Sequence, residues 1–325
     1  MLCGSFARYE MVKGSDCDWT LLVNGVVNNS HTDTARFIDR AIAKADKEDR
    51  GIKSPGSSGV FGNISFSHNL VHCIGGGPDS NENLTRRALM LLESRPVSLS
   101  DADDSQGVWE AVVRSILKRY FQEEVHFSPN ADRKVPRFLL NDLTRYWRTI
   151  CVDYAAKHWD QAGAKWALRN AKIRFSRKLL YSAGMAFCYA CQLDPPQHTE
   201  QTLFGVEQDT SADPFIELAM KFTRTPPLEY LAGFVDAFVT EVDKRQKVSN
   251  LIFGSYDKWL ALLNDDQARK NLSGLSHENA ADGDATFQHV RDLSKEFADG
   301  LKLLFFNRME DEDPIANLSL EYVGF

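Results

Sequence analysis

The stretch Leu2–Leu22, LCGSFARYEMVKGSDCDWTLL, decides the fold of the N-terminal region. It places Gly4 and Ser5 near the start of the chain and two aspartates, Asp16 and Asp18, directly before an apolar run. Aspartate is a poor strand former, and two like charges on neighbouring positions of one strand face repel each other. The pattern therefore indicates that a group outside the polypeptide compensates for the charge.

Successive side chains alternate in an extended strand, so Asp16 and Asp18 are expected on one face with their Cα atoms about 6.5 to 7 Å apart. Two carboxylates in this position can chelate a hard divalent cation such as Mg²⁺, or bracket a pair of ions that activates an attacking oxygen and stabilises a leaving phosphate. Gly4 would let the backbone approach a phosphate closely, and the Ser5 hydroxyl would help to hold it. The alternative is a solvated strand edge after an ordinary Gly-Ser turn.

The amino-acid composition limits the classes of protein to which the chain can belong. The chain has 325 residues, of which 43% are hydrophobic and 26% charged, so we expect a soluble globular protein large enough for two domains. The net charge of -7 argues against generic nucleic-acid binding, although a local basic patch can override the total. No apolar run approaches the roughly 18 to 20 residues that span a bilayer, and the N-terminus lacks the order of a signal peptide. We therefore expect a cytoplasmic protein with no membrane partner.

The cysteines are expected to be reduced thiols in apolar surroundings rather than a disulfide framework. Cys188 and Cys191 have the CxxC spacing, but no second pair accompanies them and the surrounding pattern is helical. This favours packing over metal binding or redox use.

The pattern up to about Val97 is mixed, and it is almost entirely helical from about Ser98 onward. In the first part we expect strands at Asp18–Val23 and Asn69–Gly76, helices at Thr32–Lys47 and Leu84–Ser94, and a loop at Gly51–Gly62. Further helices are expected at Gly107–Glu124, Pro136–His158, Ala164–Cys191, Asp213–Phe222, Leu228–Lys247, Leu251–Asn264 and Ala285–Phe306, with an exposed loop at Asn271–Ala285. The predicted class is α+β, with a small α/β domain over residues 1–98 and a larger all-helical domain over residues 99–325.

The quoted stretch resembles the signature of the polymerase-β-like nucleotidyltransferase superfamily. The closer likeness is to the branch with the PII-protein uridylyltransferase catalytic domain and related nucleotidyltransferases, which carries G-[GS]-x-[GA]-R-x-E and then S-D-x-D before an apolar strand. The matching residues are Gly4, Ser5, Ala7, Arg8, Glu10, Ser15, Asp16 and Asp18. The resemblance covers roughly the first hundred residues, and the helical stretch LTRRALMLLESRPVS resembles the end of that domain. It implies a mixed sheet in residues 1–98 and a helical domain that completes the nucleotide cleft.

The resemblance implies a reaction in which an acceptor hydroxyl attacks the α-phosphate of a nucleoside triphosphate and pyrophosphate leaves. Asp16 and Asp18 would bind Mg²⁺ or Mn²⁺, while Gly4, Ser5 and Arg8 would contact the triphosphate. The third catalytic carboxylate of the family is assigned to Glu93, with Asp79 as the alternative. Glu93 can also be interpreted as a helix-end carboxylate paired with Arg87 or Arg95, and Asp79 as part of a glycine-rich turn. The strand that precedes the Gly-Ser turn in the family has only Met1, Leu2 and Cys3 here, so we expect either a truncated sequence or a short sheet edge.

In the helical half, Lys165, Arg169, Lys172 and Ser176 recur at a spacing that puts them on one helix face. Since family members set basic and hydroxyl side chains against the triphosphate, the resemblance predicts that Lys172 and Ser176 face the nucleotide with Arg145 or Arg148 nearby. The alternative is a solvated basic surface. Most of the aromatic residues in these helices are expected to pack in the core. These are Tyr146, Trp147, Tyr154, Trp159 and Trp166.

The predicted function is transfer of NMP or dNMP from a nucleoside triphosphate, such as ATP, to an acceptor hydroxyl. The acceptor stays open among an oligonucleotide, a tRNA and a protein. A chain without an appended regulatory or phosphohydrolase module favours a role in conflict, either as a toxin with an antitoxin or as an enzyme that makes a nucleotide signal for an effector in anti-phage defence. The alternatives are a catalytically inactive nucleotide-binding module and a helical scaffold with an incidental Asp-x-Asp.

Overall fold

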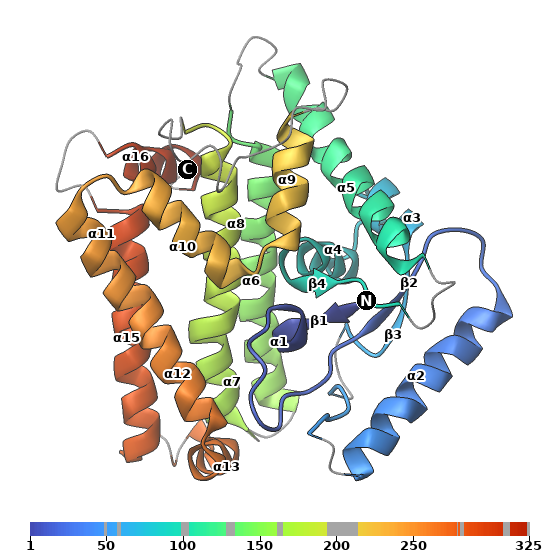
Figure 1. Ribbon diagram of the computed structural model, residues 1–325, viewed down its shortest axis with the longest axis horizontal. Coiled ribbons are helices and arrows are strands. Elements are labelled where there is room, and N and C mark those ends of the chain that lie inside the picture. Colours follow the sequence, from blue (N-terminus) through green and yellow to red (C-terminus); the bar gives the residue numbers. More distant parts are fainter. Residues whose placement is uncertain are drawn as a thin grey trace. The chain divides into compact units, whose positions relative to one another are not determined.

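The computed structural model describes residues 1–48, 51–56, 60–98, 104–127, 134–160, 165–193, 214–277, 279, 283–307 and 313–323. Helices account for most of these residues, and the few strands are short (Figure 1). The chain divides into two compact units, one formed by Met1–Pro129 and Val206–Pro227 and the other by Asn130–Gly205 and Leu228–Phe325. The boundary predicted after residue 98 thus falls inside the first unit. No helix within the described ranges combines the length and apolar character needed to cross a membrane.

The first unit contains all four strands. These are β1 (Leu2–Cys3), β2 (Thr20–Val23), β3 (Asn63–Phe66) and β4 (Ser94–Arg95). Its helices are α1 (Gly4–Ala7), α2 (Asn29–Lys47), α3 (Ser67–His72), α4 (Asn81–Glu93), α5 (Ser105–Phe127) and α9 (Pro214–Arg224). A mixed α+β unit at the N-terminal end of the chain is therefore present, as the sequence predicts.

The strands form two pairs that meet at β1. β1 pairs with β4 in antiparallel register, and β2 pairs with β3 in parallel register. An isolated antiparallel bridge joins Leu2 to Trp19, and the Thr20 amide donates to the Met1 carbonyl at 3.0 Å. The strands therefore form two two-stranded sheets, β1 with β4 and β2 with β3, which the bridge between Leu2 and Trp19 connects (Figure 1).

Helix α4 supplies the centre of this unit, because its apolar residues Leu84, Ala88 and Leu91 are all buried. It begins where the Ser80 side chain accepts a hydrogen bond from the Asn83 amide at 3.1 Å, a typical helix N-cap. It ends at Glu93, where the chain turns into β4.

Helix α9 belongs to this unit although it follows far later in the chain, and it packs on α4 and α5. Glu217 accepts a hydrogen bond from Arg114, and Arg224 forms an ion pair with Glu110 at 2.8 Å.

The second unit is helical throughout its described residues. Its elements are α6 (Arg137–Asp160), α7 (Trp166–Lys172), η1 (Ile173–Arg177), α8 (Lys178–Ala190), α10 (Pro227–Phe238), α11 (Val242–Ser249), η2 (Asn250–Gly254), α12 (Ser255–Asn264), α13 (Asp266–Gly274), α15 (Ala285–Phe305) and α16 (Pro314–Tyr322). Phe175, Trp259 and Phe297 form its aromatic centre, with the first two rings stacked at 4.9 Å. The segments η1 and η2 are π-helices, which widen a helix by about one residue per turn and are enriched at functional sites.

Several local predictions are corrected by the structure. Asn69–Gly76 is not a strand, because Ser67–His72 forms α3 and the strand lies earlier, at Asn63–Phe66. The loop predicted from Asn271 begins inside α13, which runs to Gly274. The long helix predicted over Ala164–Cys191 is divided by η1.

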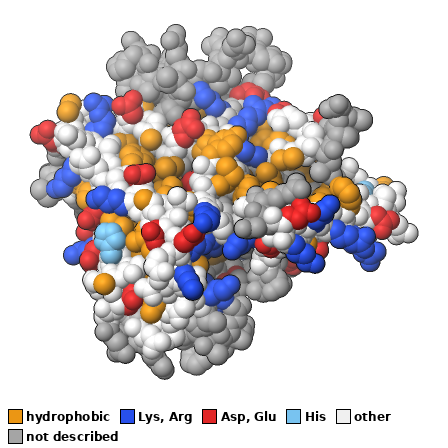
Figure 2. Space-filling model, turned by 60° about the horizontal axis from the view of Figure 1, so that its bottom comes forward, with side chains coloured by type: hydrophobic (Ala, Val, Ile, Leu, Met, Phe, Trp, Pro, Cys, Tyr) orange, Lys and Arg blue, Asp and Glu red, His pale blue; other side chains and the backbone are white. Residues whose placement is uncertain are grey.

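The surface carries mixed charge, and Figure 2 shows Lys and Arg side chains interspersed with Asp and Glu on the visible face. All six cysteines are free thiols, as expected. Cys188 and Cys191 are both buried, which agrees with a packing role. Among the aromatic residues predicted to pack in the core, Tyr146 is buried and Trp166 contacts Phe287, whereas the side chain of Trp159 lies outside the described part of the chain.

Candidate active site

The Gly-Ser turn lies directly against one of the two aspartates. Gly4 has φ +65°, and a Cβ atom built on it would meet Asp18 Oδ2 at 2.7 Å. The Cys3 amide donates to the Asp18 carbonyl at 2.8 Å, which fixes the two segments against each other. Only glycine combines this backbone conformation with this lack of space, so the identity of residue 4 is set by the Asp18 carboxylate.

The aspartates precede β2 in an extended segment with a clear alternation of burial. Ser15, Cys17 and Trp19 are buried, whereas Asp16 and Asp18 are half-buried. This alternation is what an extended backbone produces when one face packs on the core. It agrees with the prediction that both carboxylates lie on the same face.

The backbone of this segment is held on both sides of Asp16. The Val12 amide donates to Ser15 Oγ at 3.0 Å, and the Ser15 amide donates to the Val12 carbonyl at 3.0 Å. The Cys17 amide donates to the Lys53 carbonyl at 2.8 Å. No hydrogen bond or ion pair joins the Asp16 carboxylate to another residue of the described ranges.

Behind the turn lies a buried cluster of one arginine and two glutamates. Arg8 is 7% exposed, and its guanidinium donates to Glu10 Oε2 at 2.9 Å and to the Glu93 carboxylate. The cluster connects the Gly-Ser turn to the end of α4. Arg8 was predicted to contact the triphosphate and Glu93 to complete the metal site, but this geometry favours a positioning role for both.

The alternative third carboxylate, Asp79, is also engaged by an arginine. Its two oxygens accept from Arg87 at 3.0 and 2.9 Å, and Arg87 Nε donates to the Tyr120 hydroxyl at 2.7 Å. Asp79 Oδ2 also accepts from the Gly75 amide at 3.2 Å. Asp79 therefore fastens the glycine-rich turn to α4 and α5. The alternative interpretation of Glu93 was a pairing with Arg87 or Arg95, and the structure pairs it with Arg8.

The cysteines beside the aspartates are poor nucleophiles. Burial raises the pKa of the Cys3 thiol far above its usual range, and the charges of Glu93 and Asp18 raise it further. Burial and the Asp18 charge also raise the pKa of Cys17. Because the thiolate is the reactive form, both residues act as packing groups at neutral pH.

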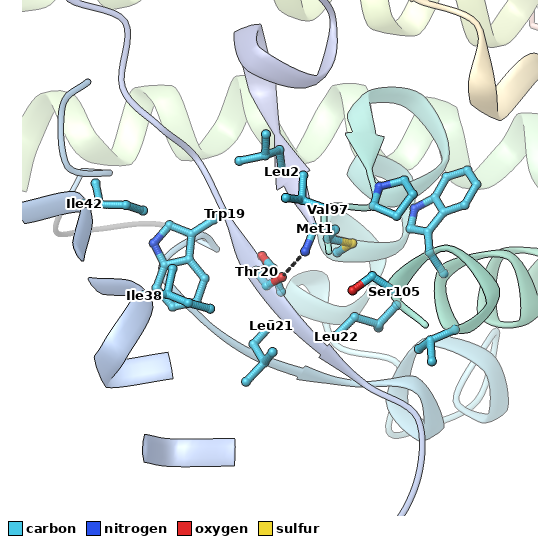
Figure 3. A pocket seen from close by; sticks show the side chains of 13 residues that line it. Met1, Leu2, Trp19, Thr20, Leu21, Leu22, Ile38, Ile42, Val97 and Ser105 are labelled. Carbon is cyan, nitrogen blue, oxygen red and sulfur yellow. Dashed lines mark hydrogen bonds between the residues drawn. The ribbon is translucent and has the colours of Figure 1, made fainter. Parts of the chain in front are cut away.

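The reverse face of the aspartate segment borders an apolar pocket of about 190 Å³. Figure 3 shows the Trp19 indole beside Ile38 and Ile42 of α2, with Met1 and Leu2 across the pocket and the Met1 amino group donating to the Thr20 carbonyl at 2.9 Å. The pocket lining includes Trp19, Leu21 and Leu22, so the chain becomes apolar directly after Asp18.

The donor set for a cation consists of two carboxylates. Within the described residues, no group of three or more His, Cys, Asp or Glu side chains is placed to hold a metal ion. Mg²⁺ commonly keeps several waters and takes only one or two protein carboxylates together with substrate phosphates. The pair Asp16 and Asp18, with the Gly-Ser turn packed closely against Asp18, fits an ion that arrives with a triphosphate.

The remaining predicted residues lie in the second unit. Arg148 is exposed on α6, and Lys172 is exposed at the end of α7. Ser176 lies in η1, where its Oγ accepts from the Tyr256 hydroxyl at 3.4 Å. Lys165 precedes α7 with φ +56°, and Ser176 lies in the π-helix η1, so the four residues do not belong to one regular α-helix. Arg145 pairs with Asp142 at 2.7 Å.

A cluster of cations in this unit includes residues that the sequence patterns did not connect. Arg174 donates to Asn170 Oδ1 at 2.5 Å and to Ser294 Oγ at 3.4 Å. The pKa of Lys178 is lowered by burial and then by the charges of Arg174 and Lys302. Burial lowers the pKa of Arg174, and the charge of Arg291 lowers it further. Arg291 and Lys302 lie on α15, more than one hundred residues away along the chain, so no local pattern could have found them.

No protein-family model matches the chain, and neither the curated proteins nor the solved structures contain a match.

Proposed function

We propose that the protein is a metal-dependent nucleotidyltransferase with a polymerase-β-like catalytic domain. The observation that carries this proposal is the arrangement of Asp16, Asp18 and Gly4. Two half-buried carboxylates share one face of an extended segment, and one of them lies over a glycine whose conformation and surroundings exclude a side chain. The resemblance of the surrounding sequence to the nucleotidyltransferase signature supports the same interpretation.

Asp16 and Asp18 would hold Mg²⁺ or Mn²⁺, which when bound would neutralise phosphate charge and increase the acidity of the acceptor hydroxyl. Gly4 keeps the turn close to the Asp18 carboxylate, and the half-buried Ser5 follows it in the chain, where its hydroxyl would contact a phosphate. Arg8 and Glu93 would keep the turn and α4 in fixed register. In the reaction the acceptor oxygen bonds to the α-phosphorus, the hydroxyl proton is released, and the bond from that phosphorus to the bridging oxygen breaks, so that pyrophosphate leaves.

Arg148, Lys172 and Ser176 would contact the triphosphate, as the resemblance implies, with positive charge from the arginine and the lysine and a hydrogen bond from the Ser176 hydroxyl. Lys172→Glu should then raise the apparent KM for the triphosphate without a comparable loss of thermal stability, because Lys172 is exposed. An unchanged KM would remove Lys172 from the proposed site.

The proposed acceptor is the hydroxyl of an oligonucleotide, a tRNA or a protein, and the proposed setting is anti-phage defence or a toxin system with a partner effector or antitoxin. The identity of the labelled product decides among these. Label on short oligomers would favour a nucleotide signal, and label on the protein itself or on tRNA would favour a modifying enzyme.

The experiment incubates the purified protein with each α-labelled NTP and dNTP in Mg²⁺ or Mn²⁺ and follows both label and pyrophosphate. The test variant is Asp16→Asn with Asp18→Asn. The matched control is Asp33→Asn with Asp39→Asn, which removes two exposed carboxylates from α2. Incorporation that the control retains and the test variant loses would support the proposal. Incorporation that survives in the test variant would contradict it.

A second candidate function is a nucleotide-binding module without turnover. The observation that favours it is the engagement of both Glu93 and Asp79 by buried arginines, which leaves two carboxylates at the site. Metal-dependent triphosphate binding that requires Asp16 and Asp18, without pyrophosphate release for any nucleotide or acceptor, would select this candidate.

A further inference from the structure

A second, polar pocket lies at the opposite end of β2 from the aspartates and has a volume of about 480 Å³. Asp18 precedes β2, whereas Asn24 follows it and lines this pocket. At about 3.3 Å per residue, the six positions between them span roughly 20 Å. The pocket is therefore separate from the candidate active site, although both belong to the first unit.

Two parallel strands present their last residues to the pocket. Val23 and Phe66 are register partners at the ends of β2 and β3, so Asn24 and Ser67 leave the pair side by side. Ser67 Oγ donates to Asn24 Oδ1 at 2.8 Å, and both residues line the pocket. In α/β proteins, ligands bind outside the carboxyl ends of parallel strands, where loops and helix starts converge.

The other wall combines α3 with one face of α5, and these two helices pack against each other. Ser115, Lys118 and Arg119 are exposed residues of α5 at positions i, i+3 and i+4, so they lie on the same helix face. His72 at the end of α3 lies opposite in the lining. No Asp or Glu is found among the described residues that form the lining.

Charge and hydrogen-bonding capacity point to one class of ligand. An arginine offers a planar fork that matches phosphate oxygens, and a lysine adds a compact point charge. The Asn24 amide nitrogen is a further donor, whereas the Ser67 and Ser115 hydroxyls donate to Asn24 Oδ1 at 2.8 Å and to the Ala111 carbonyl at 2.7 Å and would have to turn to contact a phosphate. The volume lies within the range of about 300 to 1,000 Å³ that is typical of small-molecule sites.

We propose that this pocket binds a small phosphorylated ligand, with its phosphate held by Lys118 and Arg119. A track for single-stranded nucleic acid is less well supported, because such tracks combine basic grooves with several aromatic side chains that stack on bases. Among the described lining residues, His72 supplies the one aromatic ring. The proposal requires neither metal binding nor turnover at Asp16 and Asp18, so it stands independently of the proposed function.

The test is an NMR titration of protein with isotope-labelled histidine against inorganic phosphate and, in a second arm, AMP. The protein carries Asp16→Asn and Asp18→Asn and is kept in EDTA, which removes metal-dependent binding at the other end of β2. We expect the ring signals of His72 to shift in a saturable way, while those of His289, on α15 of the second unit, stay in place. A stronger response to AMP than to phosphate would show that the ligand extends beyond its phosphate group.

The decisive variant is Lys118→Glu with Arg119→Glu, which should weaken phosphate binding about tenfold or more, as expected for the loss of two charge-assisted contacts. The matched control, Arg36→Glu with Lys44→Glu, makes the same charge change on exposed positions of α2 and should bind as the parent does. Lys118→Gln with Arg119→Gln should give an intermediate loss and guards against misfolding caused by charge reversal.

Three results would overturn the proposal. The first is a His72 spectrum that phosphate and AMP leave unchanged, and the second is equal weakening by the pocket variant and the α2 control. The third is an oligonucleotide that displaces AMP with far higher affinity, which would identify the pocket as part of a nucleic-acid surface.

Discussion

The two ends of β2 carry opposite charge and are built in opposite ways. At its beginning, Asp16 and Asp18 come from three consecutive residues, and Gly4, at the start of α1, lies against Asp18. At its end, Asn24 meets Lys118 and Arg119, which come from a helix more than ninety residues later. One strand thus separates an acidic site suited to a cation from a basic pocket suited to an anion. The comparison teaches that a site within one short segment can be predicted from sequence, whereas a site assembled by tertiary packing cannot.

The largest expected effect lies at the acidic end. Asp16→Asn or Asp18→Asn should each lower metal-dependent transfer by about 10³-fold, equivalent to about 4 kcal/mol of transition-state stabilisation. The melting temperature should stay the same or rise, because each change removes one of two like charges on the same face. Initial rates and thermal melts on the same samples measure both quantities. A parallel fall of activity and stability would instead make the aspartates structural.

The next largest effect concerns the buried ion pairs behind the site. Glu93→Ala should cost about 3 to 5 kcal/mol of unfolding free energy, because it removes a carboxylate from the buried Arg8 guanidinium. Asp79→Ala should cost a similar amount through Arg87. Urea titrations give both values.

The conservative variant Glu93→Gln distinguishes a positioning role of Glu93 from a role as a metal ligand. If Glu93 only positions the turn, the folded fraction of this variant should keep most of its activity. A loss of 10³-fold in a fully folded sample would return Glu93 to the metal site as the third carboxylate.

A smaller effect is expected at two glycines. Their substitution separates the cost of a left-handed backbone conformation from the cost of a steric contact. Gly4 and Gly75 have φ of +65° and +71°, but an added Cβ would meet Asp18 only at Gly4, and nothing lies within 4 Å at Gly75. Gly75→Ala should therefore cost about 1 to 2 kcal/mol, the penalty of the left-handed conformation. Gly4→Ala should cost more and should also reduce activity by displacing the carboxylate. Equal effects of the two changes on activity would show that the contact with Asp18 is unimportant.

The smallest effect compares a serine at each end of β2. Ser15 is buried and its Oγ accepts from the Val12 amide, so Ser15→Ala should cost about 1 to 2 kcal/mol. Ser67 is less buried and bonds to the exposed Asn24, so Ser67→Ala should change the unfolding free energy by no more than about 0.5 kcal/mol. Chemical denaturation distinguishes the two. A larger cost at Ser67 would mean that the basic end is as rigid as the acidic end.

The parts of the fold that local patterns determine were predictable. The strand at β2 and the helices α2 and α4 follow from apolar periodicity and from caps such as Ser80. The same-face placement of Asp16 and Asp18 follows from the period of two in an extended chain. The strand predicted at Asn69–Gly76 was wrong, because a short apolar run does not distinguish a strand from a buried helix. Packing of α3 on α5 selected the helix.

The roles of individual charged residues were less predictable. Whether Glu93 faces a metal or Arg8 depends on a contact across more than eighty residues. The face shared by Lys172 and Ser176 was inferred from a regular α-helix, whereas Ser176 lies in the π-helix η1. The hydrophobic pattern of the sequence does not indicate the π-helices η1 and η2 that interrupt the helices of the second unit.

The late return of α9 to the first unit has a consequence for synthesis of the protein. The first part of this unit is complete at Pro129, but α9, with Glu217 and Arg224, emerges about 95 residues later. At a translation rate of about 5 to 20 residues per second, the nascent unit waits roughly 5 to 20 seconds for the helix that covers α4 and α5. During this interval the faces of α4 and α5 that α9 covers in the folded protein would be open to solvent.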